Sequence, residues 1–182
     1  IGNQLLGIRV DFSRAIFFAH RLGAIRIDIA DGDQIDALGA SVFQRFGQLD
    51  ILVGNAAILG DLSPVSHIAP KVWEDTLNVN ATANYRLLRS FDALLRKSEA
   101  GRAIFVSSGA VDKNLPYWSA YTASKAALEA LVGAYAKEVS KVTNVRANIV
   151  HPGVVATAMR AQAFPGEDQS TLTRPSDITD VF

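Results

Sequence analysis

Strand-like runs that alternate with helix-like segments constrain the fold of this chain more than any other feature. The runs lie at 25–29, 49–53, 103–107 and 145–150. The first alternates apolar and polar residues, whereas the later ones read as continuous strands, which is typical of parallel strands buried on both faces. The pattern therefore predicts an α/β fold with a doubly wound parallel sheet, in a single domain over residues 1–182.

The clearest helix signals follow the run at 25–29. Asp31 is expected to cap a helix, Gln34 completes a capping box three residues later, and Gly47 is expected to end the helix. The predicted apolar face of this helix consists of Ile35, Leu38, Val42, Phe43 and Phe46.

Longer helix-like segments fill the other intervals. We expect one helix over about 70–97, since Pro70 suits a first helical turn, and an alanine-rich one over 119–141. Residues 14–22 also read as a helix, and residues 151–182 as loops with one or two short helices. The alanines of 119–141 predict a smooth surface that is either core or part of a subunit interface.

Polar and small residues gather where the predicted strands end. Asp28 lies in the first run, and Gly54-Asn55, Ser107-Ser108 and Pro152-Gly153 end or follow the other three. Ligands of open parallel sheets bind beyond the carboxyl ends of the strands. The sequence therefore predicts one site at this edge rather than scattered polar residues.

Tyr121 and Lys125 are the strongest candidates for chemistry at this site. They are four residues apart, so on a helix they share a face. A free phenol has a pKa of about 10, and a neighbouring ammonium lowers that pKa, which makes proton exchange with a carbonyl or alcohol feasible. Taken alone, a tyrosine and a lysine at this spacing more often lie on a helix face with a structural role than in a catalytic site.

The surroundings of this pair follow an ordered pattern. Ser108 precedes Tyr121 by thirteen residues, and Asn80 lies in an earlier helix-like segment. The segments 54–57 (Gly-Asn-Ala-Ala) and 152–157 (Pro-Gly-Val-Val-Ala-Thr) end or follow strands. Together these features resemble the short-chain dehydrogenase/reductase family, which has a Rossmann-like fold.

The resemblance covers about residues 28–157 and implies a catalytic set. Tyr121 would be the general acid/base, and Lys125 would lower its pKa and bind the nicotinamide ribose. Ser108 would hold the substrate oxygen, although it could instead be a turn serine. Asn80 would organise a water between Lys125 and solvent; the alternative is a polar residue satisfied by backbone at a helix kink.

The resemblance also implies a dinucleotide cofactor, NAD or NADP, with the choice between them open. Its predicted contacts, besides Tyr121 and Lys125, are Asp28, Asn55, Ala56, Ala57, Pro152, Gly153 and Thr157. Gly54 and Ala57 depart from the family's Asn-Asn-Ala-Gly, so tight packing without a ligand is an alternative there. For Asp28 the alternative is a loop carboxylate that caps the next helix.

The ends of the sequence depart from the family. The family opens with a strand and a glycine-rich turn that cradles a pyrophosphate, whereas residues 1–10 carry only a faint counterpart in Gly7-Ile8. The second strand, second helix, last strand and last helix have no counterpart either. We expect the fold to be incomplete at both termini because the sequence joins ordered segments of a longer chain, with a break near Ala24–Ile25. A truncated, degenerate member or a reading-frame error are the alternatives.

Composition narrows the partners. Lys plus Arg (18) balances Asp plus Glu (18), so no nucleic-acid or anionic-membrane partner is expected. Cysteine is absent, and His20, His67 and His151 have no ligand spacing, so we expect no metal. No apolar run approaches the roughly 20 residues of a membrane span. We expect a cytoplasmic homodimer or homotetramer.

The resemblance implies an NAD(P)-dependent oxidoreductase that interconverts a hydroxyl and a carbonyl of a small-molecule substrate by hydride transfer. The segment 161–168, Ala-Gln-Ala-Phe-Pro-Gly-Glu-Asp, resembles an uncharacterised bacterial oxidoreductase branch of the family and names no substrate. The rival hypothesis is a non-catalytic binding or scaffold module that has lost its phosphate loop, since fold alone does not establish activity.

Overall fold

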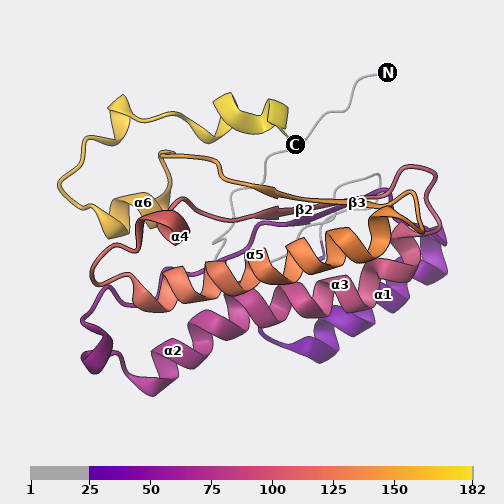
Figure 1. Ribbon diagram of the computed structural model, residues 1–182, viewed down its shortest axis with the longest axis horizontal. Coiled ribbons are helices and arrows are strands. Elements are labelled where there is room, and N and C mark those ends of the chain that lie inside the picture. The colour runs from indigo at the N-terminus through magenta and orange to yellow at the C-terminus, as the bar shows by residue number, and fades with distance from the viewer. Residues whose placement is uncertain (1–24, 182) are drawn as a thin grey trace.

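A computed structural model describes residues 25–181 as a parallel sheet with long helices against one of its faces (Figure 1). The strands are β1 (Ile51–Gly54), β2 (Arg102–Val106) and β3 (Arg146–Val150), in the order β1-β2-β3. Both neighbouring pairs are parallel. Of the two helical layers predicted for a doubly wound sheet, these residues supply one.

Three long helices make up this layer (Figure 1): α1 (Gly32–Phe46), α3 (Ala83–Leu95) and α5 (Ser119–Ser140). α2 (Pro70–Leu77) runs into α3 through a π-helical turn at Asn78–Thr82. The short elements are α4 (Ala110–Lys113), α6 (Ala158–Ala163) and 3-10 turns at Val65–His67, Gln169–Thr171 and Pro175–Val181. None of the helices in residues 25–181 is long and apolar enough to cross a membrane.

The core lies between the sheet and these helices. Phe91 of α3 and Phe105 of β2 are fully buried there, as is Leu128 of α5. The Tyr135 hydroxyl of α5 donates to Asp92 of α3 at 2.7 Å, which ties the two helices together. This packing holds α5, and with it Tyr121 and Lys125, at a fixed position along the sheet.

The predicted ends of α1 are confirmed. The Asp31 carboxylate accepts hydrogen bonds from the backbone of Asp33 and Gln34, and Gly47 ends the helix with φ 73°. The capping box differs in one respect, because the Gln34 side-chain oxygen accepts from the backbone of Asp28. The side-chain NH₂ of Gln34 donates to the carboxylate of Asp31 instead.

Two expectations about burial were wrong. Ile35, Leu38 and Val42 of α1 are buried, but Phe43 and Phe46 are about half exposed. β1 alternates between exposed and buried residues, with Ile51 and Val53 on the exposed side. The physical reason is the same in both cases: only the face turned toward the helix–sheet core is covered within the described residues.

The run at 25–29 is not a strand among the described residues. Its alternation is real, since Ile27 and Ile29 are buried while Ile25 is exposed. However, the backbone turns after Asp28, whose carbonyl accepts from Asp31 N at 3.1 Å. The predicted helix at 14–22 and the predicted break near Ala24–Ile25 involve residues outside the described part.

Gly54, at the end of β1, is a position where the packing requires glycine. A Cβ there would lie under 3.0 Å from the Phe105 ring and from the Asn84 side-chain oxygen. We therefore expect Gly54→Ala to lower the free energy of unfolding by about 1–3 kcal/mol, measured by urea denaturation. Gly133→Ala on α5 is the matched control, because no atom lies within 4 Å of its added Cβ. It should be neutral or stabilising by up to about 1 kcal/mol, and equal effects of the two would contradict this account.

Candidate active site

The predicted polar residues that follow β1, β2 and β3 lie at one edge of the sheet, whereas Asp28 lies in the turn before α1. Because β2 is the central strand, Ser107 and Ser108 lie between Asn55, which follows β1, and Pro152, which follows β3. The Ser107 backbone N–H donates to the Val150 carbonyl at 2.9 Å, which extends the ladder to this edge. α4 and α6 lie beyond these carboxyl ends, at the left in Figure 1.

Tyr121 lies in the first turn of α5, facing this edge. It is buried, and Trp118 packs edge-on against its ring with centroids 5.8 Å apart. Burial raises the pKa of the Tyr121 phenol, and the neighbouring Ser108 side chain opposes that rise. Tyr121 and Ser108 therefore meet, as the thirteen-residue offset suggested.

Lys125 lies one turn further along α5 and is 2% exposed. Its ammonium donates to the Val106 carbonyl at the end of β2, at 2.7 Å, and lies 5.9 Å from the centre of the Tyr121 ring. Burial lowers the pKa of Lys125 to about 8, against the charge of Glu129, which raises it. A buried cation is thus held between the catalytic candidate and the central strand.

The balance of effects on Tyr121 differs from the sequence-based expectation. A neighbouring ammonium was expected to lower the pKa of the phenol, but the net shift is upward because desolvation dominates. Lys125 lies on the expected side of the helix, yet its ammonium is directed to the Val106 carbonyl.

Glu129 is a site neighbour that the sequence reasoning missed. One oxygen of its carboxylate accepts from the Ser107 hydroxyl at 2.6 Å and lies 2.8 Å from His151 Nε2. It therefore links α5 to the ends of both β2 and β3. Its spacing of four residues from Lys125 on the same helix was the available signal.

Asn80 lies in the π-helical turn and is fully buried. Its side chain accepts from the Ile58 backbone N–H at 2.8 Å and donates to the Ile58 carbonyl and to the Ser124 hydroxyl, both at 2.9 Å. π-Helical turns within α-helices occur frequently at functional sites. The observed bonds show a structural role for Asn80, joining the loop after β1 to α5.

The proposed dinucleotide contacts differ in their surroundings. Asn55 is exposed, Ala56 and Ala57 are half-buried, and Ala56 packs against the core. Pro152 is half-buried, and Gly153 has φ 78° with open space around its α-carbon.

Two further candidates already hold local hydrogen bonds. The Thr157 hydroxyl caps α6 by accepting from Arg160 N at 3.1 Å. The Asp28 carboxylate accepts from Ala30 N at 2.9 Å, whereas Asp31 caps α1.

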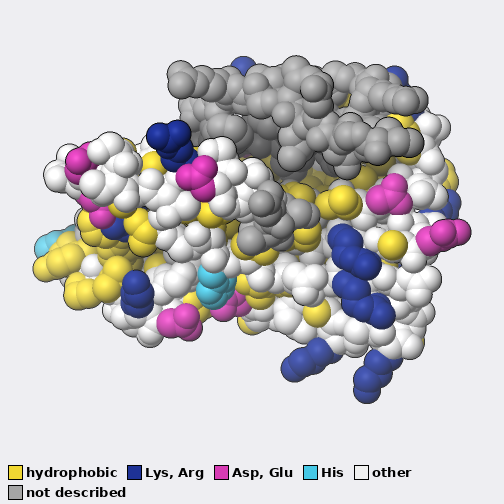
Figure 2. All heavy atoms as spheres, turned by 90° about the horizontal axis from the view of Figure 1, so that it is seen from above, with side chains coloured by type: hydrophobic (Ala, Val, Ile, Leu, Met, Phe, Trp, Pro, Cys, Tyr) yellow, Lys and Arg dark blue, Asp and Glu magenta, His cyan; other side chains and the backbone are white. Residues whose placement is uncertain are grey.

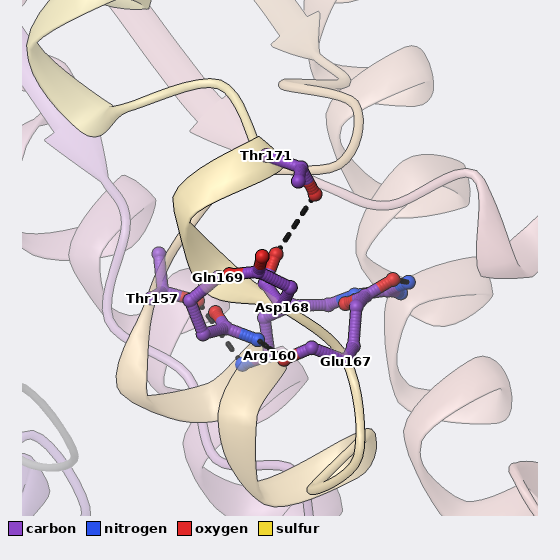
Figure 3. A network of polar contacts seen from close by, with 6 residues as sticks. All are labelled: Thr157, Arg160, Glu167, Asp168, Gln169 and Thr171. Atoms are coloured by element: carbon purple, nitrogen blue, oxygen red, sulfur yellow. Dashed lines mark hydrogen bonds and ion pairs between the residues drawn. The ribbon is translucent and has the colours of Figure 1, made fainter.

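The segment after β3 closes on itself (Figure 3). Arg160 donates two hydrogen bonds of 2.5 Å to the Glu167 carboxylate, which holds the pKa of Glu167 below its usual value. Gln169 donates to the Glu167 carbonyl, and the Thr171 hydroxyl donates to the Asp168 carbonyl at 2.8 Å. α6 is therefore fixed beside the edge that carries Tyr121.

Across residues 25–181, no group of three or more histidine, aspartate or glutamate side chains is arranged to hold a metal ion.

Comparison with known proteins decides the family. The model of the short chain dehydrogenases matches residues 14–168. The chain belongs to the short-chain dehydrogenase/reductase family. Within this family it is 38% identical over 145 residues to the uncharacterized oxidoreductase YciK of Escherichia coli, covering 80% of this chain and 57% of the relative. This match agrees with the bacterial branch suggested by residues 161–168.

Solved structures of short-chain dehydrogenases share the fold. One from Pseudomonas syringae superposes with a TM-score of 0.83 at 36% identity, over 86% of this chain and 64% of that one. One from Shigella flexneri, complexed with NADP, has a TM-score of 0.80 at 35% identity, over 85% of this chain and 65% of that one. These neighbours confirm the Rossmann-like doubly wound fold, and the chain spans about half to two thirds of their lengths.

Proposed function

We propose that this chain forms the catalytic part of an NAD(P)-dependent oxidoreductase that interconverts a hydroxyl and a carbonyl. The meeting of Tyr121 with Ser108 at the carboxyl edge of the sheet, beside the buried Lys125 ammonium, carries the proposal. Relatives with related sequences are named NAD-dependent oxidoreductases, and structural neighbours hold NADP or NADPH.

Features of this edge fit a dinucleotide. The Lys125 ammonium has three donors and is bonded here to the Val106 carbonyl, so further donors remain for a ribose hydroxyl. The open space at Gly153 lets a ligand approach the backbone of the loop after β3. Lys125 and Tyr121 would hold the ribose, Pro152, Gly153 and Thr157 the nicotinamide, and Asp28 and residues 55–57 the adenosine side.

A bound nicotinamide would supply or accept the hydride at the carbonyl carbon. In the reduction direction, Tyr121 gives its hydroxyl proton to the carbonyl oxygen, which becomes the hydroxyl of the product. Ser108 holds that oxygen by a hydrogen bond that strengthens as negative charge develops. The positive charge of Lys125 then stabilises the phenolate that remains on Tyr121.

Asn80 supports this arrangement in the proposal. Its side chain is occupied by Ile58 and Ser124, which favours a positioning role for α5. The water relay from Lys125 that the family resemblance implies is a further proposal for this residue.

Dinucleotide binding separates the enzyme from the scaffold hypothesis. The purified protein in its natural full length is titrated into NADH and NADPH, and the fluorescence of the reduced nicotinamide is followed. The oxidoreductase hypothesis predicts saturable binding of at least one of them, which excess oxidised dinucleotide reverses. No binding of either cofactor would favour the scaffold module.

We also propose that two copies associate through a groove between α3 and α5. Its walls include Tyr85, which is half exposed, together with Leu131 and Ala134. Arg89 of α3 and Glu138 of α5 also line the groove. In a two-fold contact between two copies, Arg89 of one copy can therefore face Glu138 of the other. Ala126, Ala127 and Ala130 of α5 are exposed, which favours the interface over the core for this alanine surface.

Self-association is tested by light scattering. We expect the protein to be a dimer or larger at micromolar concentration, and Ala134→Arg to shift it toward monomer because it places a bulky charge in the groove. Lys113→Ala, an exposed change outside the groove, should leave the mass unchanged. A monomeric wild-type protein would contradict the proposal.

A further inference from the structure

We propose that the site takes an apolar, uncharged carbonyl compound, recognised by the aromatic and aliphatic side chains packed around Tyr121. The inference rests on the proposed function and adds the substrate class. It is carried by the composition of that cluster, by a strained aromatic loop, and by the pairing of Arg160 with Glu167.

The Tyr121 ring belongs to a small apolar cluster at the substrate edge. Leu59 and Ala110 are buried beside it, and half-buried members come from the loop after β1, the start of α5 and α6: Leu62, Trp118, Met159 and Ala163. None of these side chains is charged. A substrate that reaches the Tyr121 hydroxyl exchanges its own surface for these contacts, so a charged group there loses hydration without a partner.

The backbone next to the aromatic members of this cluster is strained. Tyr117 has φ 72°, in the left-handed region that bulky side chains rarely adopt. Its carbonyl accepts from Ser63 N at 3.0 Å, so the loop after β1 holds the strained residue. Such strain persists where the surroundings impose it and clusters at functional sites. Here the bond from Ser63 fixes Tyr117, and the next residue, Trp118, contacts Tyr121.

Two cations lie beside the rings of this region. Lys125, beside the Tyr121 ring, donates to Val106 and in the proposed function also holds the cofactor ribose. Arg160 lies 3.7 Å from the centre of the Phe164 ring, and its charge is neutralised by Glu167 (Figure 3). The Phe164 ring in turn lies 5.7 Å from Trp118. A carboxylate or phosphate on the substrate therefore finds the charge of Arg160 already neutralised.

The surface around this end of the sheet is also partly apolar, as expected for an apolar substrate. Hydrophobic side chains form a patch at the lower left of Figure 2, bordered by charged side chains, at the end of the molecule where α2, α4 and α6 lie in Figure 1. Exposed apolar residues of the loops there are Val65, Leu115, Tyr117 and Val154. An apolar approach to Tyr121 favours a ketone or aldehyde with an aromatic or alicyclic body.

The test compares matched ketones. The full-length protein is given NADH or NADPH with a panel of neutral aryl and alicyclic ketones, and with the para-carboxylate of acetophenone, which differs from acetophenone by one added carboxylate group. We expect kcat/KM to be at least about tenfold higher for acetophenone. Equal values, or a preference for the carboxylate, would overturn the substrate class and leave the proposed function standing. No reduction of any neutral ketone would also overturn the substrate class, whereas the dinucleotide titration decides the proposed function separately.

Two tryptophan variants test whether Trp118 is responsible for the preference for the neutral ketone. Trp118→Ala should reduce this preference several-fold, mainly through KM, because it removes the largest aromatic side chain of the cluster beside Tyr121. Trp73→Ala is the matched control, since Trp73 lies on α2, outside the cluster, and is 38% exposed. An unchanged preference in Trp118→Ala would contradict the role of Trp118 in substrate recognition. If that variant does not fold, the wild-type comparison of the matched ketones still decides the substrate class.

Discussion

Replacement of Tyr121 with phenylalanine is expected to lower the rate of carbonyl reduction by about 10²–10⁴-fold, the usual contribution of a general acid. The change removes the transferable proton and the contact with Ser108, while the ring keeps its packing against Trp118. Dinucleotide affinity should change little. The measurement is steady-state reduction of an accepted ketone, together with a fluorescence titration of the reduced cofactor.

Tyr135→Phe provides the matched control for this prediction. Tyr135 lies on the same helix and is also buried, but its hydroxyl bonds to Asp92 of α3, away from the sheet edge. Its loss should lower stability by about 1 kcal/mol and leave kcat nearly unchanged. If Tyr121→Phe lost binding and rate in equal proportion, the role of Tyr121 would be structural rather than chemical.

Lys125→Met is expected to separate activity from stability. Activity should fall by about a hundredfold or more, because a unit charge 5.9 Å from the Tyr121 ring contributes about 3 kcal/mol at an effective dielectric constant of about 20. Cofactor binding should weaken as well. The free energy of unfolding should change little at pH 7, because relief of the buried charge offsets the lost bond to Val106.

The effect of Lys125→Met on the free energy of unfolding should depend on pH. The pKa of Lys125 is about 8 in the folded protein and 10.5 in a free lysine, so between these values the unfolded chain binds more protons. Stability of the wild type relative to Lys125→Met should therefore rise with pH through this window, by up to about 3 kcal/mol, and be flat below it. Urea denaturation of both proteins at pH 7 and pH 10 measures it. A constant difference would show that the buried ammonium carries no such penalty.

Local signals predicted the parts of the fold that depend on local chemistry. Asp31 and Gly47 bound α1 as expected because a cap and a left-handed glycine act within one turn. The expectation that Tyr121 lies near Ser108 came from the family resemblance and the thirteen-residue offset, and the helical spacing placed Lys125 on the same side. The caps and the helical spacing need no knowledge of tertiary packing.

Features that depend on tertiary packing were missed. For Asn80 the helix kink with backbone partners was foreseen as the alternative, but its partners Ile58 and Ser124, 22 and 44 residues away in the sequence, were not. Glu129 gained its role only when β2 and β3 placed Ser107 and His151 beside it. The upward pKa shift of Tyr121 likewise comes from burial, which depends on how loops from distant segments close over α5.

Isotope transfer tests the central claim most directly. The full-length protein is incubated with an accepted ketone and a reduced dinucleotide deuterated at the reactive carbon of its nicotinamide, and the alcohol product is examined by mass spectrometry and NMR. We expect one deuterium on the carbinol carbon with the wild type, and almost none over the same time with Tyr121→Phe. Absence of deuterated alcohol with the wild type, or equal amounts with both proteins, would contradict it.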